Sequence, residues 1–425
     1  MAQPQTSSSS SARSKKIENV LILQGGGSLG AFGCGVFKAL AKRNIKIDIV
    51  AGTSIGAVNA AIIAGGGKSG EPTEQSLEQF WLELSDSFVN LNDNLEFSYY
   101  SAGVRFMAKL LLGYYYYPFL LGRRQEEAKE NPLSSRSKRE IRLEQLRSFT
   151  SSAFFGNDKM FKPWWRLEYA NSDPEYFAPQ IWTYLYDHSV LEKTLDKYVD
   201  YTKLNPDGNP SARLVVTATD VLTAQPLVFD SSKQQITPKH ILATSGYPLY
   251  NFPWVEVPEG VYAWDGSLLS NTPIREVIAA SPINDKRIFL VENYPKKIDA
   301  LPRNLPEVYH RARDIIFCDK SEHNVRMSKV ITRYLRYIEE LYQIVEEHAD
   351  HSKIDKKHLE RIQRKYMKYK EEHGTEIKEL YYISREEPFP HMYENADFSP
   401  ETIKNSIEEG ETKTSQVIRA MKMES

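Results

Sequence analysis

LILQGGGSLGAFGCGVFKAL, residues 21–40, passes from an apolar run through three consecutive glycines into a segment with helical spacing. The run at residues 20–23 predicts a buried strand. The apolar residues that follow at helical intervals are Phe32, Val36, Phe37 and Leu40. Residues 45–65, IKIDIVAGTSIGAVNAAIIAG, repeat the order of strand, glycine-containing turn and helix. Two such units in succession predict an α/β fold in which neighbouring strands are parallel.

The first glycine turn fits the pattern of a dinucleotide-binding loop. Gly25, Gly27 and Gly30 match GxGxxG, and they occupy the strand-to-helix turn that this fingerprint requires. Asp48, eighteen positions after Gly30, stands near the position of the carboxylate that binds the ribose. Nucleotide binding is therefore one hypothesis that the sequence raises.

The second turn carries a different chemistry, because Gly52, Ser54 and Gly56 form GxSxG between a strand and a helix. A serine at such a sharp turn projects its hydroxyl above the sheet, and the two glycines let neighbouring backbone pass without a clash. The helix that begins after Ser54 directs its N-terminal amides toward an oxyanion formed there. Ser54 is therefore the candidate nucleophile.

The two turns explain each other, because both lie at the carboxyl ends of adjacent parallel strands, where open α/β sheets place their sites. The amides of Gly25, Gly26 and Gly27 can hold a phosphate or the oxyanion of an acyl transfer. A nucleotide site has no use for a nucleophilic serine on the next strand. Acyl transfer needs both parts, so it is favoured over nucleotide binding.

The chain resembles the patatin-like phospholipases in three ordered motifs. These are LQGGGSLGAFGCGVFKAL at residues 23–40, GTSIGAVNAA at 52–61 and YAWDGSLLSNTPI at 262–274. The segments at 213–230 and 240–257 resemble the family's late strand and small-residue helix, so that the likeness spans residues 17–320, about three quarters of the chain. The tail at 383–410 resembles bacterial members with a C-terminal domain of unknown function. The resemblance implies a three-layer α/β sandwich with a mainly parallel central sheet.

The resemblance also implies the roles of several residues. Ser54 becomes the nucleophile, Asp265 its partner in a Ser-Asp dyad, and the amides of Gly25, Gly26 and Gly27 the oxyanion hole. The geometry of the turn adds the amide of Ile55, since the residue after the nucleophile commonly donates to the oxyanion.

One position departs from the family pattern, since Asp-Gly-Gly is here Asp265, Gly266 and Ser267. A serine is tolerated at the third position if the backbone there does not need a positive φ. If it does need one, Asp265 is displaced and the activity is low.

A histidine base is the alternative to the dyad. His188 and His240 lie between Ser54 and Asp265 in the sequence, and His310 and His323 follow Asp265. Neither of the last two stands in a glycine-containing loop, and we predict solvated helix histidines. A carboxylate is a weak base, so Asp265 needs a desolvated setting, which the apolar, aromatic strand before it would supply. We expect that strand, too, to end at the carboxyl edge of the sheet.

The composition is that of a globular α/β protein. Hydrophobic residues make up 41% and charged residues 26% of the 425 residues, and the net charge of −2 gives no electrostatic case for nucleic acid. The two cysteines, Cys34 and Cys318, are too few for a disulfide framework, and residues 1–16 form a serine-rich tail without a signal sequence. We predict a cytoplasmic protein, with any membrane attraction local, and neither a metal nor another cofactor.

An aromatic insertion at about residues 85–180 interrupts the domain that spans 17–320. Within it, residues 101–121 are long enough to cross a bilayer, but Arg105, Lys109 and four consecutive tyrosines argue against that. A lid, a membrane-surface contact and a helix of the core remain open. Trp164 and Trp165, beside Lys162 and Arg166, suit either an interface or ordinary packing.

Residues 321–425 have a different pattern, which predicts a helical hairpin, a strand and terminal helices. Apolar residues repeat at intervals of four and three at Ile331, Leu335, Ile338, Tyr342 and Val345, and a second helix continues through Leu359, Ile362, Tyr366 and Tyr369. Coiled-coil self-association is one use of this hairpin. Residues 375–386 predict a strand that returns to the main sheet.

Together these features predict a lipid acyl hydrolase that cleaves carboxylic esters of phospholipids or related lipids at a membrane surface. An esterase or thioesterase on soluble acyl substrates is an alternative with the same chemistry. A catalytically silent membrane-docking or scaffold protein is the alternative of a different class.

Overall fold

The computed structural model describes residues 16–68, 70–87, 151–303, 305–318, 321–348, 355–386 and 394–424. The segment at 101–121, for which a lid, a membrane contact or a core helix was predicted, lies outside the described residues, as does most of the N-terminal tail. No described helix is both long and apolar enough to cross a membrane.

The central sheet has the strand order β10-β9-β1-β2-β5-β8-β7, with β6 also paired to β5. The five strands from β10 to β5 are parallel, which confirms the predicted mainly parallel sheet. The strands are β1 (Ile17–Leu23), β2 (Ile49–Gly52), β3 (Lys162–Pro163), β4 (Tyr186–Asp187), β5 (Arg213–Asp220), β6 (Pro226–Asp230), β7 (Val255–Glu256), β8 (Tyr262–Asp265), β9 (Asp285–Glu292) and β10 (Ile377–Ser384), of which β3 and β4 form a separate pair.

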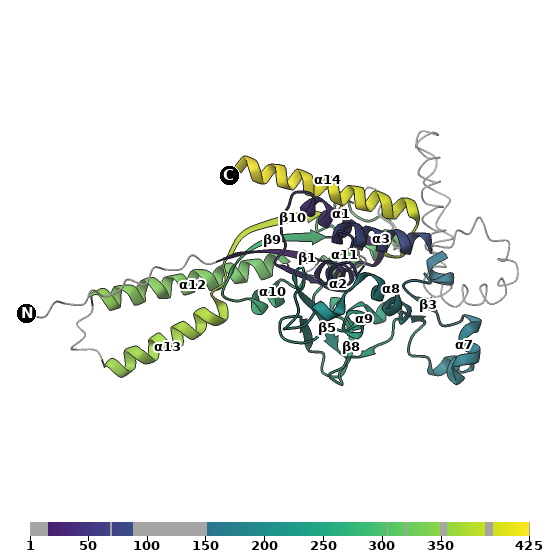
Figure 1. Ribbon diagram of the computed structural model, residues 1–425, viewed down its shortest axis with the longest axis horizontal. Coiled ribbons are helices and arrows are strands. Elements are labelled where there is room, and N and C mark those ends of the chain that lie inside the picture. The colour runs from purple at the N-terminus through teal and green to yellow at the C-terminus, as the bar shows by residue number, and fades with distance from the viewer. Residues whose placement is uncertain are drawn as a thin grey trace, which may run out of the picture.

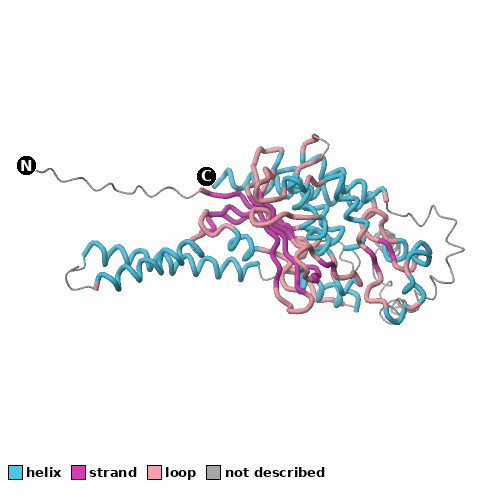
Figure 2. The backbone as a smooth tube through the Cα atoms, turned by 60° about the horizontal axis from the view of Figure 1, so that its bottom comes forward, coloured by secondary structure: helices cyan, strands magenta, loops and turns pink. Residues whose placement is uncertain are grey.

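Helices cover both faces of this sheet (Figure 2). The helices are α1 (Gly30–Ala41), α2 (Ile55–Gly65), α3 (Thr73–Asp86), α7 (Leu167–Ser172), α8 (Val190–Tyr198), α9 (Pro238–Ser245), α10 (Ile274–Ala280), α11 (Leu305–Phe317), α12 (Ser321–His348), α13 (Lys356–His373) and α14 (Pro400–Glu424). Alternate residues of β1 serve the two faces, because Leu21 packs with residues of α1, α2 and α3, whereas Ile22 packs with residues of α10 and α12. These layers are those of the expected three-layer sandwich.

The C-terminal region joins the main body at two places. The prediction of a returning strand is confirmed, since β10 pairs in parallel with β9 at the edge of the sheet. Helix α14 lies along α1 (Figure 1), and a Cβ atom at Gly35 would stand 1.9 Å from the carbonyl oxygen of Ile407. Glycine at position 35 therefore allows the two helix backbones to touch. A domain boundary near residue 320 remains a prediction.

Helices α12 and α13 form a hairpin that extends away from the sheet (Figure 1), as predicted. Only part of the predicted apolar face of α12 is covered by α13. Leu335 and Tyr342 are partly buried, and the Tyr342 ring stacks on Tyr366 of α13. Ile331 and Ile338 of the same face remain exposed. One helical partner is too narrow to cover the whole apolar face of α12.

The described part of the insertion favours ordinary packing for Trp164. Its side chain is buried and contacts the rings of Tyr169, Tyr184 and Trp182. Trp165 is partly buried and donates to the carbonyl oxygen of Phe154.

Candidate active site

Ser54 stands in the turn between β2 and α2, with φ 56° and ψ −131°. This conformation is strained for a residue with a side chain, and such strain is typical of a nucleophile at a strand-to-helix turn. The two flanking glycines make the turn possible. A Cβ atom at Gly52 would lie 2.3 Å from the carbonyl group of Gly56, and one at Gly56 would lie 2.2 Å from the carbonyl oxygen of Leu23.

The glycine loop after β1 lies directly against Ser54. Leu23 and Gly52 are neighbours in the parallel register, so the loops that follow them leave the same edge of the sheet. A Cβ atom at Gly25 would stand only 2.8 Å from the Cβ of Ser54. The structure thus brings together the two turns that the sequence analysis paired.

Asp265 reaches Ser54 by a route that differs from the predicted one. Strand β8 is antiparallel to β5, whereas we expected another strand ending at the carboxyl edge of a parallel sheet. Strands β2 and β8 pair with the same side of β5, since β6 occupies the other side. Gly52 ends β2 opposite Val216, and Asp265 pairs with Ala218, two positions farther along β5. Asp265 therefore lies just beyond the end of β2, where the Ser54 turn begins.

The carboxyl group of Asp265 is fully buried, and burial raises its pKa from the ordinary 3.8 to about 6. Hydrogen bonding from the Ser267 amide, at 2.8 Å from Oδ1, and from the Ser54 hydroxyl opposes this rise. Asp265 Oδ2 has no hydrogen-bond partner of good geometry among the described residues. A desolvated carboxylate with a pKa near neutrality is a better base than a solvated one.

Ser267, the departure from the family motif, does not displace Asp265. Its φ is not positive, because it lies in the short 3-10 helix Gly266–Leu268, and its amide donates a hydrogen bond to the Asp265 carboxylate, which caps this helix. Gly266 is the position that needs glycine, since a Cβ atom there would lie 2.5 Å from the carbonyl oxygen of Thr217.

The backbone amides of the site differ in their availability. Those of Gly26, Gly27 and Ile55 donate to no group in the described part of the chain. The amide of Gly25 donates to Asn271 Oδ1 at 2.9 Å. Three of the four predicted oxyanion donors are therefore free. The amide of Gly25 would have to break its hydrogen bond to Asn271 before it could donate to an oxyanion.

Two polar residues that hydrogen-bond to the site, Asn271 and Thr244, were missed by the sequence analysis. Asn271 accepts from both Gly25 and Ser267, and its Nδ2 donates to the carbonyl oxygen of Phe317. Thr244 accepts from the backbone amide of Ser54 at 3.2 Å. Asn271 lies in the quoted segment SNTPI, but nothing in its spacing indicated a contact 246 positions away.

The C-terminal region also reaches the glycine loop. In the 3-10 helix Glu394–Ala396, the carbonyl oxygen of Glu394 accepts from the Ser28 hydroxyl at 2.6 Å. The carbonyl oxygen of Asn395 lies so close to Gly27 that a Cβ atom there would stand 2.3 Å away, and the φ of Gly27 is +59°. Residues near the end of the chain therefore fix the shape of the proposed oxyanion loop.

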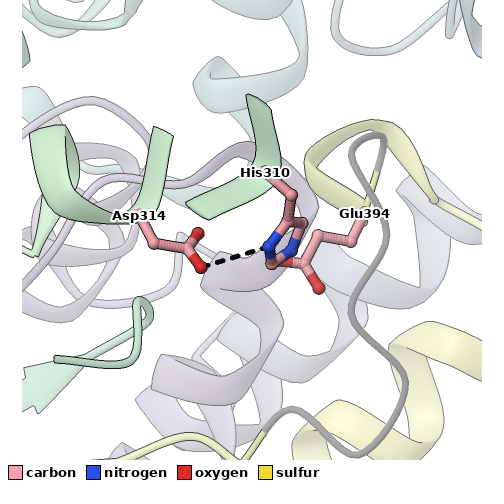
Figure 3. Close-up of side chains that lie close together, drawn as sticks. All are labelled: His310, Asp314 and Glu394. Atoms are coloured by element: carbon pink, nitrogen blue, oxygen red, sulfur yellow. Dashed lines mark ion pairs between the residues drawn. The ribbon is translucent and has the colours of Figure 1, made fainter. Parts of the chain in front are cut away.

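A buried ionic cluster supports this C-terminal contact. His310, Asp314 and Glu394 converge closely enough to suggest a metal site (Figure 3). However, the Arg313 guanidinium contacts His310 Nε2 at 2.9 Å and one carboxylate oxygen of Asp314 and of Glu394 at 2.7 Å each. Arg385 adds a second cation at 3.0 Å from Glu394. The two carboxylates are thus balanced by two arginines, and a metal ion would have to displace one of them.

Three of the four histidines considered as an alternative base have partners elsewhere, and the fourth is exposed. His188 and His240 are buried, and bind the carbonyl oxygen of Leu242 and the carboxylate of Glu259, respectively. His323 is exposed, as predicted. The prediction of a solvated His310 was wrong, because one face of α11 packs against the Glu394 segment and takes His310 into the ionic cluster.

The geometry does not favour a dinucleotide site. Asp48 precedes β2 and therefore lies at the amino end of that strand, on the edge of the sheet opposite to the glycine loop. It accepts from Lys16 Nζ and from the Asn19 amide. It cannot meet the ribose of a nucleotide whose pyrophosphate binds the glycine loop.

Comparison with solved structures gives distant matches. VipD from Legionella pneumophila is 14% identical with a TM-score of 0.35, and the match covers 96% of this chain and 67% of that one. A chain of the complex of full-length SpcU with full-length ExoU, from the type III secretion system of Pseudomonas aeruginosa, is 19% identical with a TM-score of 0.24. That match covers 71% of this chain and 49% of the other. No curated protein matches the chain.

Comparison with protein families gives a match that spans the site. The family model described as patatin-like phospholipase covers residues 21–278, which is more than half of the chain and includes Ser54, Asp265 and the glycine loop. The chain belongs to the patatin-like phospholipase family, a family of lipid hydrolases.

Proposed function

We propose that the chain is a serine hydrolase that cleaves carboxylic ester bonds of phospholipids through a Ser54–Asp265 dyad. The observation that carries this proposal is the convergence of a strained serine, a buried carboxylate with a raised pKa and free backbone amides at one edge of the sheet. Family membership supports the class of substrate.

In the proposed reaction, Asp265 takes the proton of Ser54 as the serine oxygen attacks the ester carbonyl carbon. The amides of Gly26, Gly27 and Ile55 donate to the resulting oxyanion. When the tetrahedral intermediate collapses, the proton passes from Asp265 to the leaving alkoxide, and an acyl-Ser54 ester remains. Water then attacks this ester while Asp265 takes a proton from the water. When the second tetrahedral intermediate collapses, Asp265 returns that proton to the Ser54 oxygen, and a fatty acid leaves.

Apolar residues beside the site support a lipid substrate. Leu268 and Leu269 directly follow Ser267, and Leu249 and Tyr250 follow α9, which carries the Thr244 contact to Ser54. Their exposed fractions lie between 36% and 73%. Such a rim suits an acyl chain better than it suits water.

Helix α11 supports action at a membrane surface, because it buries charged side chains and exposes apolar ones. Its buried face carries the charged cluster around Arg313. Its exposed apolar residues are Leu305, Val308, Tyr309, Ile315 and Ile316. The helix ends at Phe317, whose carbonyl oxygen binds Asn271 of the site. The ion pairs hold the apolar face outward, where a lipid surface could receive it.

The first test is the release of free fatty acid from mixed phospholipid micelles in the presence of EDTA. The wild type and Ser189→Ala, which removes an exposed serine hydroxyl, should release fatty acid, and Ser54→Ala should not. Retained hydrolysis by a folded Ser54→Ala protein contradicts the dyad. Cleavage of a soluble short-chain ester without any phospholipid hydrolysis would indicate a soluble esterase instead.

A second experiment tests the membrane surface. Ile316→Asp should lower hydrolysis of vesicle phospholipid about tenfold or more and leave cleavage of a soluble ester unchanged, because one buried isoleucine contributes roughly 2 kcal/mol to interfacial binding. Ile283→Asp is the matched control, since Ile283 is 58% exposed, close to the 64% of Ile316, but precedes β9, on the opposite edge of the sheet. Equal effects of both substitutions would contradict the assignment of α11.

A further inference from the structure

Helix α12 carries a long exposed apolar stripe on the side away from its partner helix. The stripe consists of Met327, Val330, Tyr334, Tyr337, Leu341 and Ile344, which repeat at intervals of three and four residues, and all of them except the partly buried Val330 are exposed. Tyr334 is 65% exposed, and Tyr337 and Ile344 are each 57% exposed. Ile331, Ile338 and Val345 widen it along one edge. This repeat of 3.5 residues, sustained over most of the helix, is typical of a coiled-coil seam.

The other side of α12 already has its contacts within the chain. Val325 is buried in the core below the sheet, and the Thr332 hydroxyl donates to the carbonyl oxygen of Thr375. Farther along the helix, Glu339 pairs with Lys370 of α13, and Tyr342 stacks on Tyr366. The helix cannot rotate to bury the stripe without breaking these contacts.

Charges along one edge of the stripe change sign at its middle. Arg326, Arg333, Glu340 and Glu347 are spaced by seven residues and occupy the positions that flank a coiled-coil seam. All four are exposed, and none forms an ion pair with another described residue. The half of the edge nearer the sheet is therefore basic, and the half nearer the tip of the hairpin is acidic.

We infer that this stripe binds the same stripe of a second copy of the chain, with the two α12 helices antiparallel. A two-fold axis between residues 335 and 336 places Tyr334 against Tyr337 of the second copy. It also places Arg333 beside Glu340 and Arg326 beside Glu347 of the second copy, so that every edge charge meets its opposite. A parallel arrangement would instead place these charges beside the apolar residues Ile331, Ile338 and Val345 of the second copy, where none of them meets an opposite charge.

The shape of the molecule permits this pairing. Helix α12 has 28 residues and is therefore about 42 Å long, and the hairpin extends away from the sheet in both views (Figures 1 and 2). An antiparallel pair places the two main bodies at opposite ends of the paired hairpins. The acidic half of the edge disfavours the other apolar occupant, an anionic membrane surface, because glutamates are repelled by it.

The test is a charge exchange in the full-length chain, followed by sedimentation across a range of protein concentrations. The wild type should show a concentration-dependent rise from 48.8 kDa toward about twice that mass. Arg333→Glu alone, and Glu340→Arg alone, each create two like-charged pairs per dimer and should raise the dimer Kd about tenfold or more. Lys329→Glu should change the dimer Kd little, because Lys329 is exposed and belongs neither to the stripe nor to the four edge charges.

Two rescues distinguish this interface from a loss of folding. The double variant Arg333→Glu with Glu340→Arg should dimerise like the wild type. A mixture of the two single variants should form heterodimers, because one chain then supplies two acidic groups and the other two basic groups. Wild type that stays monomeric, or single variants that neither weaken the dimer nor rescue each other, would overturn the inference. Mass alone decides the outcome, so a failure of the proposed hydrolase activity does not affect it.

Discussion

Replacement of Asp265 by asparagine should make the protein inactive and, at neutral pH, more stable. Asparagine has the shape of the aspartate side chain, and its Oδ1 can still accept from the Ser267 amide at the distance of 2.8 Å seen for Asp265. What the substitution removes is a negative charge from a fully buried position. The free energy of burying that charge is a cost that the wild type bears and the variant avoids.

The raised pKa sets the size of this cost. In the folded protein the carboxyl titrates at about 6, against 3.8 in the absence of burial. A difference of about two pH units corresponds to roughly 3 kcal/mol above pH 7. Because the folded pKa is the higher one, the wild type loses stability relative to the variant as the pH rises from about 4 through 6. Between pH 4.5 and 7.5 the loss should be about 2 kcal/mol.

The assay is urea unfolding followed by tryptophan fluorescence at pH 4.5, 6.0 and 7.5. Asp207→Asn, at an exposed position, serves as the control and should follow the wild type at each pH. A stability difference between wild type and Asp265→Asn that does not change with pH would refute the assignment of a buried, titrating carboxylate. Hydrolysis retained by the variant would refute its role as the base, whatever the stability.

Four further outcomes follow from the geometry of the site. The kcat/KM for ester hydrolysis should fall about tenfold per pH unit below about 6, as measured in a pH-rate profile, because Asp265 must be ionised to act as the base. Ser54→Gly should raise the free energy of unfolding by about 1 kcal/mol in a urea titration, since glycine relieves the positive φ; no gain would mean that the turn is unstrained. Gly27→Ala should abolish hydrolysis and destabilise the fold by roughly 1–3 kcal/mol, because its Cβ would meet the Asn395 carbonyl oxygen. Arg313→Met should lower the unfolding free energy by about 3–5 kcal/mol, since it leaves buried carboxylates without their main cation, and added zinc that restored stability would favour a metal site instead.

The amino-acid sequence alone determined the strand-turn-helix units, the serine turn and the parallel sheet. These features are local, because a buried strand is an apolar run and a helix is a spacing of apolar residues. Glycine is required at positions 52 and 56 because backbone segments pass close to each other at a sharp turn. In the structure, neighbouring backbone atoms do lie too close to both glycines to leave room for a Cβ atom. The returning strand β10 was also predictable from its local pattern.

Only the tertiary structure decided how distant segments complete the site. The antiparallel direction of β8 depends on which side of β5 remains open after β2 ends, and no local pattern records that. The contact of Asn271 with Gly25 and that of Asn395 with Gly27 join residues hundreds of positions apart. His310 was misassigned for the same reason, since helical spacing gives the face of a residue but not the charged loop that will cover it. Long-range packing, and not propensity, decides such pairings.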